Sequence, residues 1–270
     1  MDICFIGGGN MATALIGGLL KRDFAVEQLR VVEINADHRL KLQNDFGVQA
    51  TAELADGVAC SDVVVLAVKP QQLREVCAQL APLLKGQLIV SIAAGIRASD
   101  IARWLGTENI VRAMPNTPAL IQSGITGLFA LPAVDAVQRE MAQSILDAVG
   151  NTLWLDDEAM MDAVTAISGS GPAYVFYFIE AMERAAMELG FAAHDARALS
   201  LETFLGAVKL ASASKDEVSV LRARVTSKNG TTERALLSME ANQVKQHIVE
   251  AVEAAAIRSK EMGDELGSAN

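Results

Sequence analysis

A glycine-rich turn between a short apolar segment and a helix-forming stretch constrains the fold more than any other feature of the sequence. Residues 3–6 predict a buried strand, and a helix-forming stretch begins at Met11. Between them, Gly7 permits a tight turn and Gly9 lets the backbone approach a pyrophosphate, while Ala12 keeps helix and strand close. The free N–H groups at the start of the helix then point at phosphate. The turn therefore predicts a dinucleotide-binding unit, with an ordinary structural turn as the alternative.

Strand-like and helix-like segments alternate through the first half of the 270-residue chain. The run Val63–Val68 is apolar throughout, which suits a parallel strand that is buried on both faces of a sheet. This alternation predicts an α/β fold with a Rossmann-type doubly wound sheet over residues 1–153. The predicted strands are 3–6, 30–34, 63–68, 88–92, 110–114 and 127–130, and the predicted helices are 11–21, 37–46, 71–84, 99–105 and 135–148.

After Asn151 the strand signals give way to three long helix-like segments, 156–189, 196–212 and 231–262. We therefore expect an all-helical domain over residues 154–270. Its helix from Tyr174 is apolar around much of its circumference in the first two turns. Such a helix is buried either in a subunit interface, which predicts at least a dimer, or in the core of a single chain.

The composition bears on location and partners. Apolar residues make up 51% of the chain, yet no apolar run reaches the roughly 18 residues of a membrane-spanning helix, and no secretory signal is visible. Cys4, Cys60 and Cys77 have no C-x-x-C spacing, so we expect free thiols and a cytoplasmic location. The chain has a formal charge of −10 and no basic patch of the kind that binds anionic surfaces, so we expect neither nucleic acid nor a membrane as partner. No residue cluster has metal-ligand spacing, and we predict no metal.

The second predicted strand runs into Glu33-Ile34-Asn35. Glu33 lies close to where dinucleotide-binding units carry an acidic residue that bonds the ribose 2′-hydroxyl of NAD. A carboxylate there would repel the 2′-phosphate of NADP. Asn35 and Arg39 could nevertheless hold that phosphate if Glu33 points away, and a solvated pair of Glu33 and Arg39 is a third interpretation. The residues leave NAD and NADP both open.

Further candidate residues follow other predicted strands, at the sheet edge where ligands bind in such folds. Lys69 could contact cofactor phosphate or ribose, and Pro70 fits the first position of a helix. The small residues of Ser91–Gly95 leave room for a flat ring. Asn116, in a stiff loop between two prolines, offers its amide to a carboxamide or a substrate group.

Two helix-opening turns stand out in the second half. Ser168–Tyr174 lacks the G-x-S-x-G pattern of a hydrolase nucleophile, and no histidine stands beside a serine or cysteine motif. In the other turn, the N–H groups of Gly230, Thr231 and Thr232 would form a carboxylate pocket at a helix start. A plain helix cap, with Glu233 near the helix dipole, is the alternative.

Taken in chain order, these motifs resemble pyrroline-5-carboxylate reductases over nearly the whole chain. The resemblance implies an NAD(P)-dependent oxidoreductase that acts on a C=N bond. It would reduce 1-pyrroline-5-carboxylate to L-proline, the final step of proline biosynthesis, by hydride transfer to the cyclic imine. It implies NADP as cofactor, with NAD as the alternative, and a homodimer that can assemble into a ring such as a decamer. The motifs are Gly7–Ala12, Val68–Pro70, Ser91–Gly95, Met114–Pro118, Ser168–Tyr174 and Gly230–Thr232.

The resemblance also implies roles for individual residues. Gly230, Thr231 and Thr232 would hold the substrate carboxylate and ring nitrogen, with the Thr232 hydroxyl as the catalytic contact nearest the nitrogen. Glu158 matches a position near the substrate. The residues implied for the cofactor are Ile6, Gly7, Gly8, Gly9, Asn10, Met11, Asn35, Ala67, Lys69 and Ala93, to which the sequence reasoning adds Asn116.

The chain departs from the family pattern before the threonines. Ser227–Gly230 reads Ser-Lys-Asn-Gly where the family usually has Ser-Pro-Gly-Gly, and Arg222-Ala223 stands where Lys-Asp is usual. Asn229 can adopt left-handed backbone angles, so we expect the turn to survive. Lys228 would add positive charge near the substrate carboxylate.

Two other functions compete with imine reduction. A β-hydroxyacid dehydrogenase of similar layout would need a lysine base in the helical domain, and Lys209 and Lys215 are the candidates, although neither lies in a matching glycine-rich motif. A nucleotide-binding sensor without activity is supported only by the altered Ser227–Gly230 turn. Imine reduction itself needs little acid–base machinery, which agrees with the lack of a histidine base.

Overall fold

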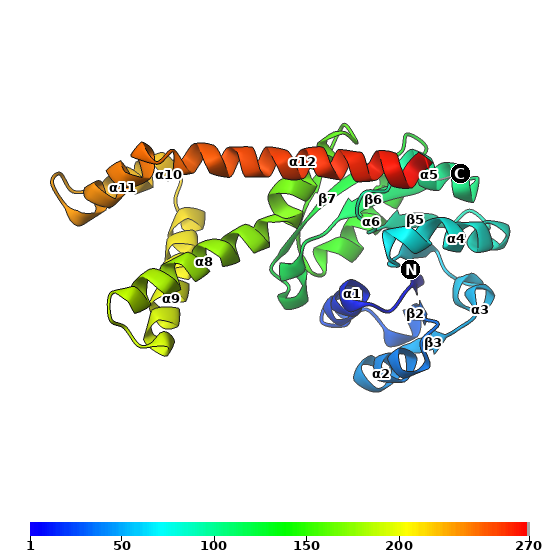
Figure 1. Ribbon diagram of the computed structural model, residues 1–270. Helices are drawn as coiled ribbons and strands as arrows, with labels where there is room; N and C mark the ends of the chain where they lie inside the picture. The colour runs from blue at the N-terminus through cyan, green and yellow to red at the C-terminus, as the bar shows by residue number, and fades with distance from the viewer. Residues whose placement is uncertain (269–270) are drawn as a thin grey trace. The chain divides into compact units, whose positions relative to one another are not determined.

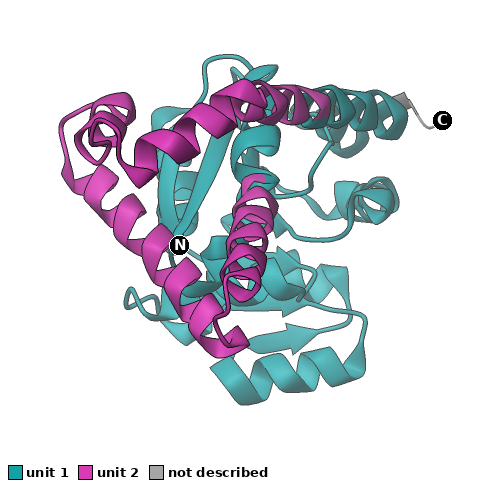
Figure 2. Cartoon of the chain, turned by 60° about the vertical axis from the view of Figure 1, so that its left-hand side comes forward, with its two compact units in different colours: residues 1–170, 255–270 teal, residues 171–254 magenta. Residues whose placement is uncertain are grey.

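The structure is a computed structural model that describes residues 1–268. The chain forms two compact units (Figure 2). Unit 1 comprises Met1–Ser170 together with the chain from Ala255 onward, and unit 2 comprises Gly171–Ala254. Among the described residues, none of the helices combines the length and the apolar character that crossing a membrane requires.

Unit 1 contains a single eight-stranded sheet with the order β3-β2-β1-β4-β5-β6-β7-β8 (Figure 1). The first six strands in this order are parallel, whereas β7 runs antiparallel to β6 and β8 runs parallel to β7. In register, Ile6 at the end of β1 pairs with Val32 of β2 and with Leu66 of β4. The carboxyl ends of the parallel strands therefore meet at one edge. The strands are β1 Ile3–Ile6, β2 Leu29–Val32, β3 Gln49–Thr51, β4 Val63–Leu66, β5 Leu88–Ser91, β6 Ile110–Met114, β7 Gly124–Ala130 and β8 Gly150–Trp154.

Helices cover both faces of this sheet, as the predicted doubly wound fold requires. Side chains alternate along β1, so Ile3 and Phe5 pack into one buried cluster and Cys4 and Ile6 into another. Residues of α1, α2 and α6 join the first cluster, and residues of α3, α4 and α5 join the second. The helices are α1 Asn10–Leu20, α2 Ala36–Phe46, α3 Leu54–Val58, α4 Pro70–Leu80, α5 Ala98–Leu105, α6 Ala136–Asp147 and α7 Met160–Val164, with short 3₁₀ turns at Val26–Gln28, Ala81–Leu83 and Thr117–Ile121 and a π turn at Thr165–Gly169.

Unit 2 is entirely helical and has little core of its own. Its α8 packs against α9, yet α8 contains no buried residue, and Phe176 and Tyr177 are 66% and 71% exposed. An apolar helix that stays this exposed favours the predicted subunit interface over the core-helix alternative. The helices are α8 Gly171–Glu188, α9 Ala193–Ala213, α10 Val218–Arg224, α11 Thr231–Ala241 and the first part of α12 Val244–Ser268.

Several elements differ from the sequence predictions. The predicted helix 231–262 is two helices, because Gln243 takes a left-handed φ of 53° and ends the run between α11 and α12. The strands β3 and β8 and the helices α3 and α10 were not predicted. The predicted helix 156–189 begins at Met160 and is divided into α7 and α8 by the π turn Thr165–Gly169. The compact units also differ from the predicted domains 1–153 and 154–270, because α7 packs against β7 and the end of α12 bonds to α5. Residues 154–170 and the chain from Ala255 therefore belong with the sheet.

Candidate functional site

The turn after β1 has the geometry that the sequence predicts for a phosphate-binding turn. Gly7 has a φ of 100°, and its N–H donates to the carbonyl oxygen of Val32 at 2.8 Å. A Cβ atom on Gly7 would lie 2.7 Å from the carbonyl oxygen of Ala67, so the main chain directly after β4 passes too close for any side chain. Only glycine satisfies both the backbone angle and this contact.

The start of α1 forms an open cradle. Gly9 is the N-cap residue, makes no side-chain cap, and has nothing within 4 Å of the position that a Cβ would occupy. Since the first amides of a helix have no acceptor inside the helix, those of Asn10 and Met11 are directed at this open space. Ala12, in contrast, is buried against the sheet. The cradle fits an anionic group such as a pyrophosphate.

Glu33, directly after β2, turns its carboxylate toward this cradle. Its Oε2 accepts the N–H of Gly8 at 2.9 Å, and its Oε1 accepts the N–H of Asn35 at 2.8 Å. The Arg39 guanidinium does not pair with the Glu33 carboxylate, contrary to the interpretation of a solvated charge pair. Its Nη1 instead donates to the main-chain carbonyl oxygens of Glu33 and Ile34 at 2.7 and 3.0 Å. The Asn35 side chain caps α2 by accepting the N–H of His38. The Glu33 carboxylate therefore does not point away from the cradle, which was the condition for Asn35 and Arg39 to hold a 2′-phosphate.

The segments after β4 and β5 lie along the same sheet edge. Ala67 continues the ladder by donating its N–H to the carbonyl oxygen of Ile6 at 2.8 Å. Lys69 is the exposed N-cap of α4, and Pro70 occupies its first position, as predicted. Ala93 is buried, and its N–H donates to the Ser91 hydroxyl. Unit 1 thus brings together the predicted cofactor residues Ile6 to Met11, Ala67, Lys69 and Ala93, with Asn35 at the end of β2.

Asn116 follows β6 and has a structural contact that the sequence did not predict. Its Oδ1 accepts the N–H of Ile125 at 3.0 Å, and the residue is largely buried. The side-chain oxygen therefore holds β7 in place. Any contact between Asn116 and a ligand would fall to its NH₂ group.

Glu158 lies after β8 and belongs to a polar cluster in unit 1. Its Oε1 accepts from the Arg112 guanidinium at 2.9 Å and from the Ala98 N–H at the start of α5 at 2.7 Å. Arg112 is only 4% exposed on β6, so the ion pair is largely removed from water. Both residues line a cavity of about 520 Å³ together with Arg97, Asp162 and Lys260. The hydrogen bond that Arg97 donates to the Asp264 carboxylate raises the pKa of Arg97 further above its usual range.

Arg112 was missed by the sequence reasoning. The signal was present, because an arginine in the middle of the apolar strand 110–114 is unusual and needs a partner. What the sequence could not supply was the identity of that partner, 46 positions later.

In unit 2, Gly230, Thr231 and Thr232 form the predicted helix-opening turn. Gly230 is the N-cap of α11 without a side-chain cap, and a Cβ there would collide with Ser227. Asn229 adopts the left-handed φ of 60° that the departure from the family pattern requires. Its N–H donates to Glu233 at 2.7 Å, so the helix cap of the alternative interpretation is present as well. The amides of the first turn remain available for a carboxylate.

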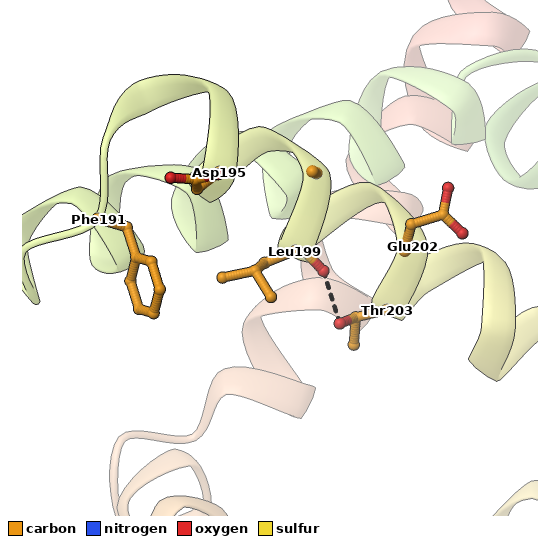
Figure 3. A pocket seen from close by; sticks show the side chains of 6 residues that line it. Phe191, Asp195, Leu199, Glu202 and Thr203 are labelled. Atoms are coloured by element: carbon orange, nitrogen blue, oxygen red, sulfur yellow. Dashed lines mark hydrogen bonds between the residues drawn. The ribbon is translucent and has the colours of Figure 1, made fainter.

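Another hollow of unit 2 lies on α9. Figure 3 shows Phe191 and Leu199 beside Asp195 and Glu202, with the Thr203 hydroxyl bonded to the Leu199 carbonyl oxygen at 2.7 Å. This bond stays within one helix, and no candidate site residue lines the hollow. It is part of the exposed apolar surface of unit 2 rather than a chemical site.

Comparisons with known proteins agree with both halves of this description. Residues 158–262 match the family described as pyrroline-5-carboxylate reductase dimerisation, and residues 2–95 match the family described as NADP oxidoreductase, coenzyme F420-dependent. A pyrroline-5-carboxylate reductase of Pseudomonas aeruginosa is 49% identical over 267 residues, which cover 98% of both chains. The chain belongs to the pyrroline-5-carboxylate reductase family.

Other members of the pyrroline-5-carboxylate reductase family support this assignment. The Haemophilus influenzae protein is 42% identical over 263 residues, covering 96% of this chain and 97% of that one. The solved structure from Coxiella burnetii has 40% identity and a TM-score of 0.92 over 97% of this chain and 98% of its own. The Plasmodium falciparum structure, solved with NADP bound, has 30% identity and a TM-score of 0.87 over the same shares. The chain is thus an oxidoreductase that forms a homo-oligomer.

Proposed function

We propose that this protein reduces 1-pyrroline-5-carboxylate to L-proline with NADPH, the final step of proline biosynthesis, and that NADH can replace NADPH. The observation that carries the proposal is the open cradle at Gly9, in a chain 49% identical to a pyrroline-5-carboxylate reductase. The cradle fits the pyrophosphate that both nucleotides share. Residues Ile6 to Met11, Asn35, Ala67, Lys69, Ala93 and the NH₂ group of Asn116 would hold the cofactor.

The reaction is a hydride transfer to the carbon of a protonated cyclic imine. The bound cofactor supplies the hydride, and the protein supplies position and charge. The imine nitrogen is basic enough to take its proton from water, and the amine product keeps it. A dedicated acid–base residue is therefore not needed, in agreement with the absence of a histidine base from the motifs.

The first turn of α11 supplies the substrate contacts in this proposal. The amides of Gly230 and Thr231 would bind the carboxylate, because a helix start favours an anion. The Thr232 hydroxyl would orient the ring nitrogen. Lys228, one residue before Asn229, adds a positive charge that attracts the same anion.

Glu158 would act on the positive charge of the iminium. One carboxylate oxygen is held by Arg112 and Ala98, and among residues 1–268 the other has no hydrogen-bond partner. An oriented carboxylate of this kind stabilises a cation through charge rather than through proton transfer.

Replacing Thr232 by alanine tests the assignment. Since a hydrogen bond to a charged group contributes about 1.5–3 kcal/mol, we expect kcat/KM for the imine to fall by about tenfold or more, with the nucleotide dissociation constant unchanged. Thr226→Ala is the matched control, because that hydroxyl, just after α10, donates to the carbonyl oxygen of Arg222 at 2.7 Å. Unaltered turnover in Thr232→Ala would refute the catalytic role of Thr232. Failure of the unmodified protein to oxidise either nucleotide with the imine would refute the proposed function.

The homo-oligomer is proposed to be a dimer joined through unit 2, and the dimers to assemble into a decamer. The exposed apolar surface of α8 and α9 supports the dimer. Sedimentation equilibrium separates a dimer from a ring of ten chains. We also propose a cytoplasmic location, for which the buried free thiols of Cys4 and Cys77 give support.

Family membership favours this function over a β-hydroxyacid dehydrogenase. Lys209 lies on the exposed surface of α9 and Lys215 follows that helix, so neither has the surroundings of a lysine that acts as a base. An inactive sensor would bind nucleotide without oxidising it, which the same assay detects.

A further inference from the structure

The structure bears on which nicotinamide dinucleotide this chain selects, because it fixes the direction of the Glu33 carboxylate. The carboxylate lies between the phosphate-binding turn and the start of α2, where it accepts the N–H groups of Gly8 and Asn35 at 2.9 and 2.8 Å. Each of its oxygens is thus held by one backbone amide. Glu33 cannot turn into solvent without giving up both bonds.

The main chain around Glu33 is itself held on both sides. Its N–H donates to the Thr51 carbonyl oxygen on β3 at 2.9 Å, and its carbonyl oxygen accepts from Arg39 at 2.7 Å. A Cβ on Gly8 would lie 3.3 Å from the Glu33 Oε2, so the side chain is also packed closely against the turn. Backbone and side chain together fix the negative charge at this place.

The end of the second strand is where a dinucleotide-binding unit receives the adenosine ribose. A carboxylate there accepts a hydrogen bond from a 2′-hydroxyl, whereas a 2′-phosphate brings negative charge against it. Ile34, which is 81% exposed at the same strand end, offers an apolar surface for the adenine ring.

Arg39 is the cation nearest in sequence that could compensate. Its Nη1 is already bonded to the carbonyl oxygens of Glu33 and Ile34, at 2.7 and 3.0 Å. Its remaining donors would attract a 2′-phosphate, but the Glu33 carboxylate, tied to the turn, would stay in place. The two side chains therefore have opposite effects on NADPH binding.

We propose that Glu33 is a specificity-determining residue that disfavours the 2′-phosphate and so lets this chain use NADH alongside NADPH. The inference rests on the proposed function for the identity of the cofactor. It concerns the choice between two nucleotides at one residue and not the reaction itself.

The test compares nucleotide binding in the absence of any imine. Dissociation constants of NADPH and NADH are measured by nucleotide fluorescence for the full-length oligomer and for Glu33→Gln and Glu33→Ser. We expect the ratio of NADPH affinity to NADH affinity to rise about tenfold in both variants, because both remove the charge. Far-UV circular dichroism and thermal unfolding establish that each variant is folded. A second readout uses 5′-AMP and adenosine 2′,5′-bisphosphate as competitors, which differ only in the 2′-phosphate.

Two further variants complete the experiment. Glu53→Gln removes an exposed acidic charge after β3 and should leave the affinity ratio unchanged. Arg39→Met should lower NADPH affinity more than NADH affinity. An unchanged ratio in both folded Glu33 variants overturns the inference, whether or not the imine is reduced. A raised ratio with no imine reduction would leave the inference standing and refute the proposed function alone.

Discussion

The pairing of Arg112 with Glu158 predicts unequal costs for removing its two members. Glu158→Ala leaves a cation that is 4% exposed on β6 without its partner, and it also deprives the Ala98 N–H of its acceptor. Arg112→Met replaces the cation with an apolar side chain of similar length. The Glu158 carboxylate then keeps its bond to the start of α5 and its partial contact with water.

The structure sets the expected magnitudes. Breaking a buried ion pair on one side costs about 3–5 kcal/mol, so we expect about 3 kcal/mol for Glu158→Ala. The side chain of Glu158 is 20% exposed and faces a helix N-terminus, so we expect only about 1 kcal/mol for Arg112→Met. The double variant should cost less than the sum of the two, because no unpaired charge remains.

The assay is urea unfolding followed by far-UV circular dichroism, at one fixed protomer concentration because the protein is an oligomer. Lys41→Met serves as the control, since its ion pair with Asp45 on α2 is exposed and should contribute less than about 0.5 kcal/mol. The reasoning fails if Glu158→Ala costs no more than this control, or if Arg112→Met is the more destabilising of the two.

Three further predictions follow from the turn, the thiols and the exposed helix. Gly7→Ala should impair folding and nucleotide binding together, because its Cβ would lie 2.7 Å from a carbonyl oxygen, whereas Gly9→Ala should keep the unfolding midpoint and lose nucleotide affinity, as measured by calorimetry. Burial raises the pKa of Cys4 and Cys77 to about 12, so a thiol reagent at pH 8 should modify only the exposed Cys60 in the folded protein. All three cysteines should react once the chain is unfolded. The unfolded chain loses these two protons from about pH 9 while the native chain keeps them, so the free energy of unfolding should fall as pH rises above 9; a flat profile from pH 9 to 11 would contradict this. Phe176→Glu should reduce the oligomer on size-exclusion chromatography, since this exposed side chain is assigned to the subunit interface.

Much of the sheet could be predicted from the sequence because its strands are buried on both faces. The run Val63–Val68 has no polar residue, and a continuous apolar run followed by turn residues leaves few alternatives. The strand Gln49–Thr51 escaped prediction because it has three residues, none of them strongly apolar, and forms the outer end of the sheet order. The break at Gln243 also carries no glycine or proline, so local sequence gave no sign of it.

The parts of the candidate site that depend on backbone angles could be predicted from the sequence. The parts that depend on which side chains bond to one another could not. The glycine turn and the left-handed Asn229 follow from the few residue types that tolerate those backbone angles. The direction of the Glu33 carboxylate depends on a rotamer and on the Gly8 amide, 25 positions away in sequence. The bond between Arg112 and Glu158 spans 46 positions and joins elements that only the folded sheet brings together.

The division of α12 between the two units has a consequence for how the chain folds during synthesis. The residues from Ala255 onward belong to unit 1, where Ser259 donates to Asp162 at 2.7 Å and the Gly267 carbonyl oxygen accepts from Arg103 at 2.9 Å. A ribosome makes these residues after all of unit 2. The nascent nucleotide-binding unit therefore lacks part of its own structure until the second part of α12 has been synthesised. Stalling the ribosome before Ala255 should yield a sheet domain that a protease cleaves near α5 and α7.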